Sequence, residues 1–288
     1  MLKFTLASRH METGTRERFF YEWSHIHVAL MLTTPSVMRA FKRYVQHFNV
    51  PDVRSQDLFY PLSSEQWESF AEHHVDRYDD VVKIVREPDY VARMQPHKFS
   101  SHRFITSISE FQTAYQRPDF RSGGVKLLHF LKKSPDFTQA DFRKRMLNVR
   151  APKLAKAFSE RPGIRKYVVN TLLDVDPAIF KGTLFEFGST GLYAGIEELW
   201  LDNAPSSGGI TADKEVADAI RTTEQGAIDS TESISMVVVE RVVWDFVTPG
   251  ATSPVPAILN PDSLESMIDG QGYRPWELQE IAAAVARD

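Results

Sequence analysis

The sequence predicts an α+β fold made of two fused, ferredoxin-like β-α-β-β-α-β repeats. The main observation is an internal repeat: residues 3–45 align with residues 126–168 without a gap, at a constant offset of 123. Both copies show the same order, which is a short apolar strand, a loop, a long helix and a second short strand. The matched pairs include Lys3 and Lys126, Thr15 and Thr138, Phe19 and Phe142, Ser36 and Ser159, Tyr44 and Tyr167, and Val45 and Val168.

A second match, at an offset of 115, predicts the third strand of each repeat. Residues 78–85, YDDVVKIV, align with residues 193–200, YAGIEELW. We therefore expect third strands at 81–85 and at 196–201. The two offsets differ by 8, which places a longer connection in the first repeat, within residues 49–77.

The first long helix carries a buried stripe with a histidine at its edge. The stripe has the i, i+4, i+7 spacing of one helix face and consists of Phe19, Trp23, Ile26 and Leu30. His27 follows Trp23 by four residues, so its side chain can reach a pocket under the helix. Histidine changes charge near neutral pH, which suits it to acid–base work. The simpler alternative is a partly buried structural histidine.

Caps, prolines and alternation predict the other elements. In the first repeat we expect a strand at 2–9, a helix at 15–34 that Pro35 ends or kinks, a strand at 43–48, a helix at 63–74, the strand at 81–85, a short helix from Pro88 and a strand at 101–111. In the second repeat we expect a strand at 125–132, a helix at 138–159 kinked at Pro152, strands at 166–172 and 196–201, a helix at 213–224 and a strand at 234–246.

This order of elements predicts how the two repeats pack. A ferredoxin-like sheet carries its helices on one face and leaves the other face bare. Two fused repeats can bury both bare faces against each other, which gives a pseudo-symmetric α+β barrel. The expected divisions are residues 1–116 and 125–247 for the repeats. Residues 248–288 form a proline-rich arm and a last helix.

Composition excludes several classes of function. The chain has 288 residues and a net charge of -4, so no basic field exists to recruit nucleic acid. It has no cysteine, which excludes disulfides, cysteine-ligated metals and a cysteine nucleophile. We find no phosphate-binding glycine motif, no serine-hydrolase elbow and no metal-ligand spacing. The apolar stretch at the N-terminus is too short for a signal peptide, because polar residues follow it within a few positions. No run of 18 apolar residues occurs, so we expect a cytoplasmic protein without a membrane segment.

Three short motifs resemble the EthD family of dimeric α+β barrel proteins. They are Trp23 with His27-Val28-Ala29-Leu30, the strand Arg43-Tyr44-Val45-Gln46-His47, and residues 193–202, YAGIEELWLD. The resemblance covers residues 1–247 as two copies. The second copy departs from it, because Met146 replaces Trp23 and Arg150 replaces His27.

The resemblance implies a cofactor-independent enzyme of the dehydratase, decarboxylase or oxygenase type that acts on an aromatic or polyketide-like small molecule. It also implies a pocket between the sheet and its helices. The candidate catalytic residues are His27, His25 and Tyr44, with His27 as the general acid or base and a tyrosine hydroxyl on the substrate oxygen. The candidate substrate-binding residues are Tyr21, Trp23, His47, Arg150, Tyr167 and Tyr193. Because side chains alternate along a strand, only one of the pairs Tyr44/Gln46 and Val45/His47 can face that pocket.

Three questions stay open at this stage. Related barrels bind haem through an axial histidine, and His102 and His129 are candidates for that ligand. The chain can also be a binding or stress-associated barrel without turnover. Because the two repeats already supply the contact between sheets, the chain can be a monomer or a homodimer.

Overall fold

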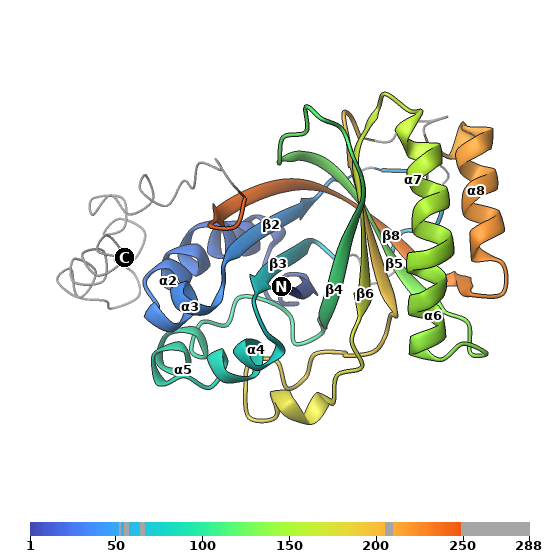
Figure 1. The fold of residues 1–288 in the computed structure, drawn as a ribbon. Coiled ribbons are helices and arrows are strands. Elements are labelled where there is room, and N and C mark those ends of the chain that lie inside the picture. Colours follow the sequence, from blue (N-terminus) through green and yellow to red (C-terminus); the bar gives the residue numbers. More distant parts are fainter. Residues whose placement is uncertain (52, 55–57, 64–66, 205–209, 249–288) are drawn as a thin grey trace.

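The computed structural model describes residues 1–51, 53–54, 58–63, 67–204 and 210–248 (Figure 1). The C-terminal arm and helix expected beyond Thr248 lie outside the described residues. The first half contains β1 (Leu2–Ser8), α1 (Arg16–Tyr21), the π-helix η1 (Glu22–His27), α2 (Val28–Leu32), α3 (Pro35–Ala40), β2 (Arg43–Asn49), β3 (Ser69–Val75), α4 (Tyr78–Ile84), α5 (Pro88–Met94) and β4 (Ile105–Gln116). The second half contains β5 (Gly124–Lys133), α6 (Gln139–Arg145), the π-helix η3 (Met146–Arg150), α7 (Ala151–Ser159), β6 (Ile164–Leu172), η4 (Pro177–Phe180), β7 (Gly195–Leu201), η5 (Ile210–Ala212), α8 (Lys214–Glu224) and β8 (Ile228–Asp245).

The eight strands form one closed antiparallel barrel in the order β1-β3-β2-β8-β5-β7-β6-β4. Within the first half the order is β4-β1-β3-β2, and within the second half it is β8-β5-β7-β6. Numbered within each half, both orders are 4-1-3-2, which is ferredoxin-like. The halves are joined where β2 pairs with β8 and where β4 pairs with β6. The predicted fold class, a pseudo-symmetric α+β barrel, is confirmed.

The third strand of the first half was predicted in the wrong place. Residues 69–75, SFAEHHV, form β3 instead of the expected helix, and Val81 lies in helix α4 instead of a strand. Strand β3 is buried on both faces, so its glutamate and histidines do not mark a solvent side. Acidic residues in the first turn stabilise the start of helix α4. The Asp80 carboxylate accepts the Arg77 backbone N–H at 2.9 Å. The strand register matches Glu72 with Glu198, at an offset of 126.

The long helix of each half contains a π-helical turn that the sequence did not predict. In the first half this turn ends at His27, and in the second it ends at Arg150, the matched position. The first helical run ends at Leu32, just before Pro35 as expected, and Pro35 then begins the new helix α3. Pro152 lies in the first turn of α7, directly after the π-turn, and the helical run continues from Gln139 to Ser159. Single π-turns are often found at functional sites, and this one aims His27 at the sheet.

The last strand of each half has different limits from those expected. β4 runs to Gln116 instead of ending at 111, and β8 begins at Ile228 instead of 234. The strand residues that were not predicted include many polar ones, because these ends of the strands are partly exposed, as at 112–113 and 230–232. Alternation of apolar residues therefore underestimates strands that extend beyond the barrel body.

The barrel interior holds a buried layer of charges from both halves. Lys126 Nζ lies 2.7 Å from Glu72, 2.6 Å from Glu198 and 3.1 Å from Glu240, and Lys3 also pairs with Glu72 and Glu198. Burial is the largest single influence on Glu72 and Glu240 and would raise the pKa of each, but Lys126 together with the other neighbouring basic groups outweighs it, so both pKa values lie well below the usual range. The matched residues Lys3/Lys126 and Glu72/Glu198 thus tie the two sheets together.

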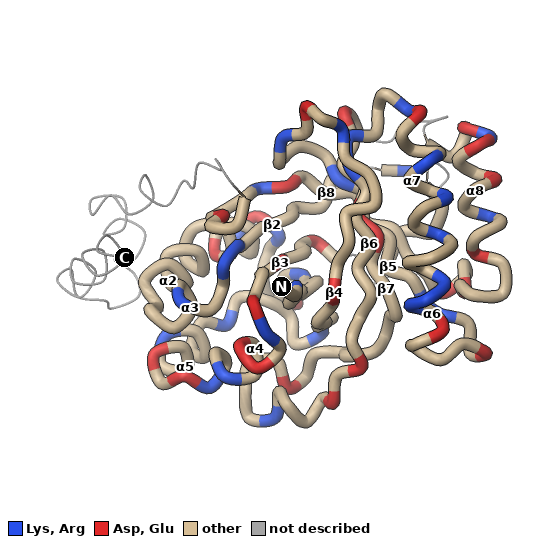
Figure 2. The backbone as a smooth tube through the Cα atoms, in the orientation of Figure 1, with Lys and Arg blue, Asp and Glu red and all other residues tan. Residues whose placement is uncertain are grey.

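The helices cover the outer faces of the two half-sheets. Figure 1 shows α2 to α5 at one end of the barrel and α6 to α8 packed at the other. Figure 2 shows basic residues along α7 and both basic and acidic residues along α8. Within the described residues, no helix has the length and apolar character needed to span a bilayer.

Candidate functional site

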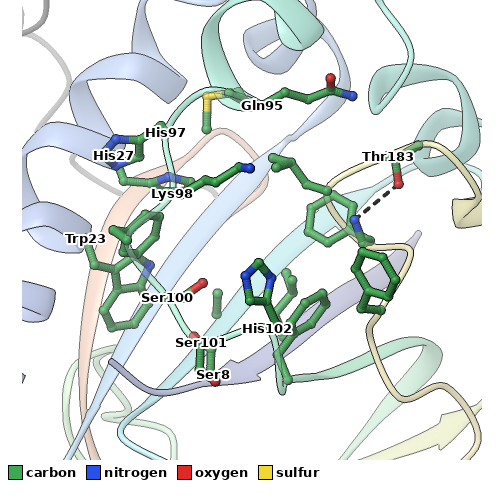
Figure 3. A pocket seen from close by; sticks show the side chains of 18 of the residues that line it. Ser8, Trp23, His27, Gln95, His97, Lys98, Ser100, Ser101, His102 and Thr183 are labelled. Atoms are coloured by element: carbon green, nitrogen blue, oxygen red, sulfur yellow. Dashed lines mark hydrogen bonds between the residues drawn. The ribbon is translucent and has the colours of Figure 1, made fainter. Parts of the chain in front are cut away.

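A cavity of about 440 Å³ lies between the outer face of the first half-sheet and its helices (Figure 3). Strands β1 and β3 form its floor, and the π-helix η1 with α2 and α5 covers it. The segment 95–104 closes one side, and residues 182–187, from the connection between β6 and β7, close another. The second half therefore contributes part of the wall of a pocket in the first half. The apolar wall includes Phe4, Trp23, Met31, Phe99, Phe104 and Phe185.

His27 lines this cavity and carries a buried imidazole nitrogen that has no hydrogen-bond partner among the described residues. The π-turn η1 carries the residue, and its ring lies 5.0 Å from the Phe99 ring and 5.9 Å from the His97 ring. Its Nδ1 atom is buried and has no hydrogen-bond partner among the described residues. Burial, with a smaller contribution from His97 and His73, holds the pKa of His27 well below its usual range. The imidazole is therefore neutral at pH 7 and can accept a proton or a hydrogen bond.

Two further histidines line the cavity, and the sequence analysis did not select either of them. His97 follows α5, and its buried Nε2 atom also lacks a partner among the described residues. Burial lowers the pKa of His97 to about 4. His73 projects from β3, with Nδ1 3.3 Å from the Phe4 carbonyl oxygen, and burial lowers its pKa to about 3. The period-2 pattern of Ala71 and His73 could have indicated this wall, had β3 been recognised as a strand.

Polar groups gather on the segment 95–104 and next to it. Ser100, Ser101 and Lys98 line the cavity together with Ser8 of β1, and Figure 3 shows the Lys98 side chain extending toward the centre. His102 lies at the exposed rim. The pocket wall is therefore rich in aromatic side chains and carries a few polar groups, namely imidazoles, hydroxyls, the Gln95 amide, the Lys98 ammonium and the Glu186 carboxylate, an arrangement typical of small-molecule sites.

The other predicted residues of the first long helix and its neighbouring strand lie behind or outside the pocket. Tyr44 is fully buried, stacks on His73 with ring centroids 4.6 Å apart, and accepts a hydrogen bond from Gln46 Nε2 at 2.9 Å. Burial raises its pKa above the usual value. His25 pairs with Ser24 Oγ at 2.7 Å and stacks on the exposed Tyr21, away from the cavity. Tyr44 can thus position His73, whereas direct substrate contact by His25 and Tyr21 is not supported.

His47 and Tyr193 also lie away from the pocket. As the strand alternation requires, His47 points into the barrel, opposite to Tyr44, where its Nε2 atom lies 2.8 Å from Lys126 Nζ. Tyr193 packs against Phe130, with ring centroids 5.5 Å apart, next to the apolar cluster of the barrel interior. Both residues serve the barrel core instead of the predicted binding site.

Arg150 and Tyr167 belong to a closed interface in the second half. Arg150 forms a bidentate ion pair with Glu197, with Nε–Oε1 and Nη2–Oε2 distances of 2.7 and 2.9 Å. The Tyr167 hydroxyl donates to Glu197 Oε1 at 2.5 Å, and His129 Nδ1 lies 3.4 Å from Oε2. All four side chains are buried. Burial is the largest single influence and would raise the pKa of Glu197, but Arg150 and His129 together outweigh it, so the pKa lies well below the usual range.

The residues of the pocket do not fit haem. His129, one of the two proposed axial ligands, is enclosed beside Glu197, where no cavity is open to it. His102 is at the rim, and the two carboxylates of haem would meet a wall with a single lysine, Lys98, and the acidic Glu186. Groups of three or more histidine, aspartate or glutamate side chains that could hold a metal ion do not occur among the described residues.

The fold and the cavity define an eight-stranded α+β barrel with a pocket between the first half-sheet and its helices. No protein-family model matches the sequence, and no curated protein sequence matches it. Among solved structures, the chain is similar to a protein from Lactobacillus acidophilus proposed to be a monooxygenase, with a TM-score of 0.46 and 9% identity over 84% of this chain and 95% of that chain. A protein from Fusobacterium nucleatum with the same proposed activity has a TM-score of 0.45 and 8% identity over 84% and 92%. A chlorite dismutase from Candidatus Nitrospira defluvii, in complex with imidazole, has a TM-score of 0.42 and 9% identity over 92% and 94%.

Proposed function

We propose that the chain is a cofactor-independent enzyme that acts on one aromatic or polyketide-like molecule in the pocket of its first half. The observation that supports this most directly is the pair of unpartnered nitrogens, His27 Nδ1 and His97 Nε2, which are buried in the wall of a cavity rich in aromatic side chains. Buried polar groups are normally satisfied, so these two are explained if a ligand provides the missing partners. His27 takes the role of proton acceptor, and Trp23 contacts the ring of the substrate.

The common step of the proposed reactions is removal of a proton next to a carbonyl or from a phenol. The proton passes to the neutral His27 imidazole, and the electron pair left behind moves onto the substrate oxygen. The enolate or phenolate then lies next to the new imidazolium, which stabilises it. Return of the proton to a leaving hydroxyl would complete a dehydration. The hydroxyls of Ser100 and Ser101 can donate hydrogen bonds to the charged oxygen.

The low pKa of His27 restricts which substrates suit it. A base whose conjugate acid has a low pKa is weak, so it removes only relatively acidic protons. Phenols and carbon acids between two carbonyl groups, which polyketide-like molecules contain, meet this requirement. The anion formed in the pocket would raise the pKa of His27 back toward its ordinary value, because an opposite charge favours the imidazolium.

Exchange of hydrogen for deuterium in 2-tetralone tests the proposal. This bicyclic ketone has an acidic methylene group between its aromatic ring and its carbonyl, and proton NMR in D₂O follows the loss of that signal. The protein is expected to accelerate exchange, and His27→Gln should remove roughly 10²-fold or more of the acceleration. His25→Gln is the matched control, because His25 lies on the same π-turn but outside the cavity.

Two results would contradict the proposal. Equal exchange rates in the protein and in His27→Gln, with calorimetry showing that 2-tetralone still binds, would leave a binding barrel without turnover. Native mass spectrometry and a visible absorbance scan of the purified protein provide a second test, since an added mass with a Soret band would show bound haem. The same mass spectrum separates a monomer from a homodimer. The expected cytoplasmic location stays a prediction.

A further inference from the structure

We infer that the pocket selects an aromatic ligand with one negative charge, a carboxylate in particular, and that Lys98 is the residue that recognises this charge. The inference rests on the proposed function, because it concerns the ligand of the same pocket. It goes further in one respect: the resemblance to EthD proteins and the histidines indicate where a proton is exchanged, but they do not predict that the ligand is charged.

Lys98 is a cation without a counter-ion at the edge of the pocket. It lines the cavity, and Figure 3 shows its side chain reaching toward the middle of the surrounding side chains. Among the residues that the structure describes, none forms an ion pair or a hydrogen bond with its ammonium group. The buried lysines of the barrel differ in this respect, because Lys126 contacts three carboxylates. An exposed lysine normally points into water, whereas this one extends over an aromatic cavity.

The acidic residue of the wall does not neutralise Lys98. Glu186 Oε2 accepts the backbone N–H of Gly182 at 3.0 Å, which holds the carboxylate on its own loop. The three buried histidines of the wall, His27, His73 and His97, are neutral at pH 7 because burial lowers the pKa of each. Lys98 therefore provides the positive charge nearest to a ligand, and Glu186 disfavours a ligand with two negative charges.

The positions of these groups define the shape of the ligand. His97 and Lys98 are neighbours on the segment 95–104, and the rings of His27 and His97 pack on Phe99 with centroid distances of 5.0 and 4.8 Å. Figure 3 shows the Lys98 side chain extending from beside the two histidines toward the middle of the cavity, so its ammonium group lies away from the imidazoles. A ligand that reaches both the imidazoles and the ammonium group has a hydroxyl or carbonyl at one end, a flat apolar body against the aromatic wall and a carboxylate at the other end.

Calorimetry with two nearly isosteric probes tests the inference. 6-Hydroxy-2-naphthoate carries a hydroxyl and a carboxylate at opposite ends of a bicyclic ring. 6-Hydroxy-2-naphthamide has the same ring and hydroxyl, with an uncharged amide in place of the carboxylate. At neutral pH and low salt the full chain should bind the carboxylate about fivefold more tightly than the amide, as a partly exposed ion pair allows. Lys98→Met should reduce the preference to less than about twofold, and high salt should weaken it as well.

Lys144→Met is the matched control, because Lys144 is an exposed lysine on α6 in the other half. It should keep the preference of the unmodified chain. Equal binding of both probes by the unmodified chain, or an unchanged preference in Lys98→Met, would overturn the inference and leave the proposed function standing. Failure of both probes to bind would overturn the proposed function together with the inference.

Discussion

The helix–sheet interface of the first half surrounds a cavity, whereas the matched interface of the second half is filled by a buried ion pair. The matched positions are His27 and Arg150 at the end of the π-turn, and Ala71 and Glu197 on the third strand. Where the second half has a long guanidinium and a carboxylate, the first half has an imidazole and a methyl group. We expect the difference in side-chain volume at these two positions to decide between a binding pocket and a closed core.

The comparison also shows how the two halves cooperate. The helix–sheet interface of the second half is filled by the Arg150–Glu197 pair, but the connection between β6 and β7 supplies residues 182–187 of the pocket wall in the first half. A fused chain can therefore specialise one copy for stability and the other for binding. Because the barrel interior is shared, both copies retain the lysine and glutamate that join the sheets, Lys3/Lys126 and Glu72/Glu198.

The largest expected effect is the loss of stability when the closed half loses one member of its ion pair. Arg150→Met leaves Glu197 buried with only hydroxyl and imidazole partners, and should lower the free energy of unfolding by about 3–5 kcal/mol. The double variant Arg150→Met/Glu197→Leu should recover most of that loss, because no charge is left uncompensated. Urea unfolding monitored by circular dichroism measures both. A double variant less stable than Arg150→Met would show that the pair itself stabilises the fold.

A second prediction converts the open half into a copy of the closed half. Ala71→Glu alone should destabilise the protein by about 2–3 kcal/mol, because it buries a carboxyl group without a cationic partner. Adding His27→Arg should recover about 1–2 kcal/mol, since the new pair can form as Arg150 and Glu197 do, with the Tyr44 hydroxyl in place of Tyr167. The double variant should no longer bind 6-hydroxy-2-naphthoate in calorimetry. Retained binding would contradict the idea that these two positions decide whether a cavity exists.

A third prediction concerns pH, because the open half holds neutral histidines. The pKa of His73 is about 3 and that of His97 about 4 in the folded protein, against about 6.5 for an unfolded histidine. The unfolded chain therefore binds more protons below pH 6.5, and stability is lost as pH falls from about 6.5 toward 4. His73→Phe keeps a ring against Tyr44 but removes one of these protons. Its unfolding free energy should fall less steeply between pH 6 and 5, by up to about 1.4 kcal/mol per pH unit.

Urea unfolding at a series of pH values provides the measurement. At pH 8 histidine is uncharged in both the folded and the unfolded chain. The difference in unfolding free energy between His73→Phe and the unmodified protein at that pH therefore gives the loss of packing alone. Parallel stability curves for the two proteins below pH 6.5 would show that His73 does not titrate on unfolding.

The sequence predicted the parts of this fold that depend on regular patterns. The gapless match of residues 3–45 with 126–168 placed β1, β2, β5 and β6 within about two residues, and it paired His27 with Arg150 correctly. β3 was missed because both of its faces are buried, so Glu72 and His73 obscured the alternation that identifies a strand. Because β3 was missed, the alignment of the repeats placed the third strand on the apolar run around Val81. That run belongs to an amphipathic helix.

The candidate site was predictable only where one helix carried it. Trp23 and His27 lie four residues apart on η1 and both line the cavity, while their roles in binding and catalysis stay predictions. His73 and His97 reach the same cavity from β3 and from the segment after α5, and this depends on a tertiary arrangement that a misplaced strand conceals. Arg150 and Tyr167 were expected at a pocket because they match His27 and Tyr44 of the first half. The interface around them is closed by Glu197, whose counterpart in the first half is the small residue Ala71.

The smallest expected effect compares the two matched helix caps. Thr15 and Thr138 begin the long helix of each half, and each side chain accepts a backbone N–H three residues later, from Arg18 at 3.2 Å and from Asp141 at 3.1 Å. Thr138 Oγ1 also donates to Asp141 Oδ2 at 2.7 Å. Replacement by alanine should cost about 0.5–1 kcal/mol at Thr15 and about 1–1.5 kcal/mol at Thr138. Urea unfolding of the two single variants gives the difference, and a larger loss for Thr15→Ala would show that the helix over the open pocket depends more on its cap than the helix over the closed core.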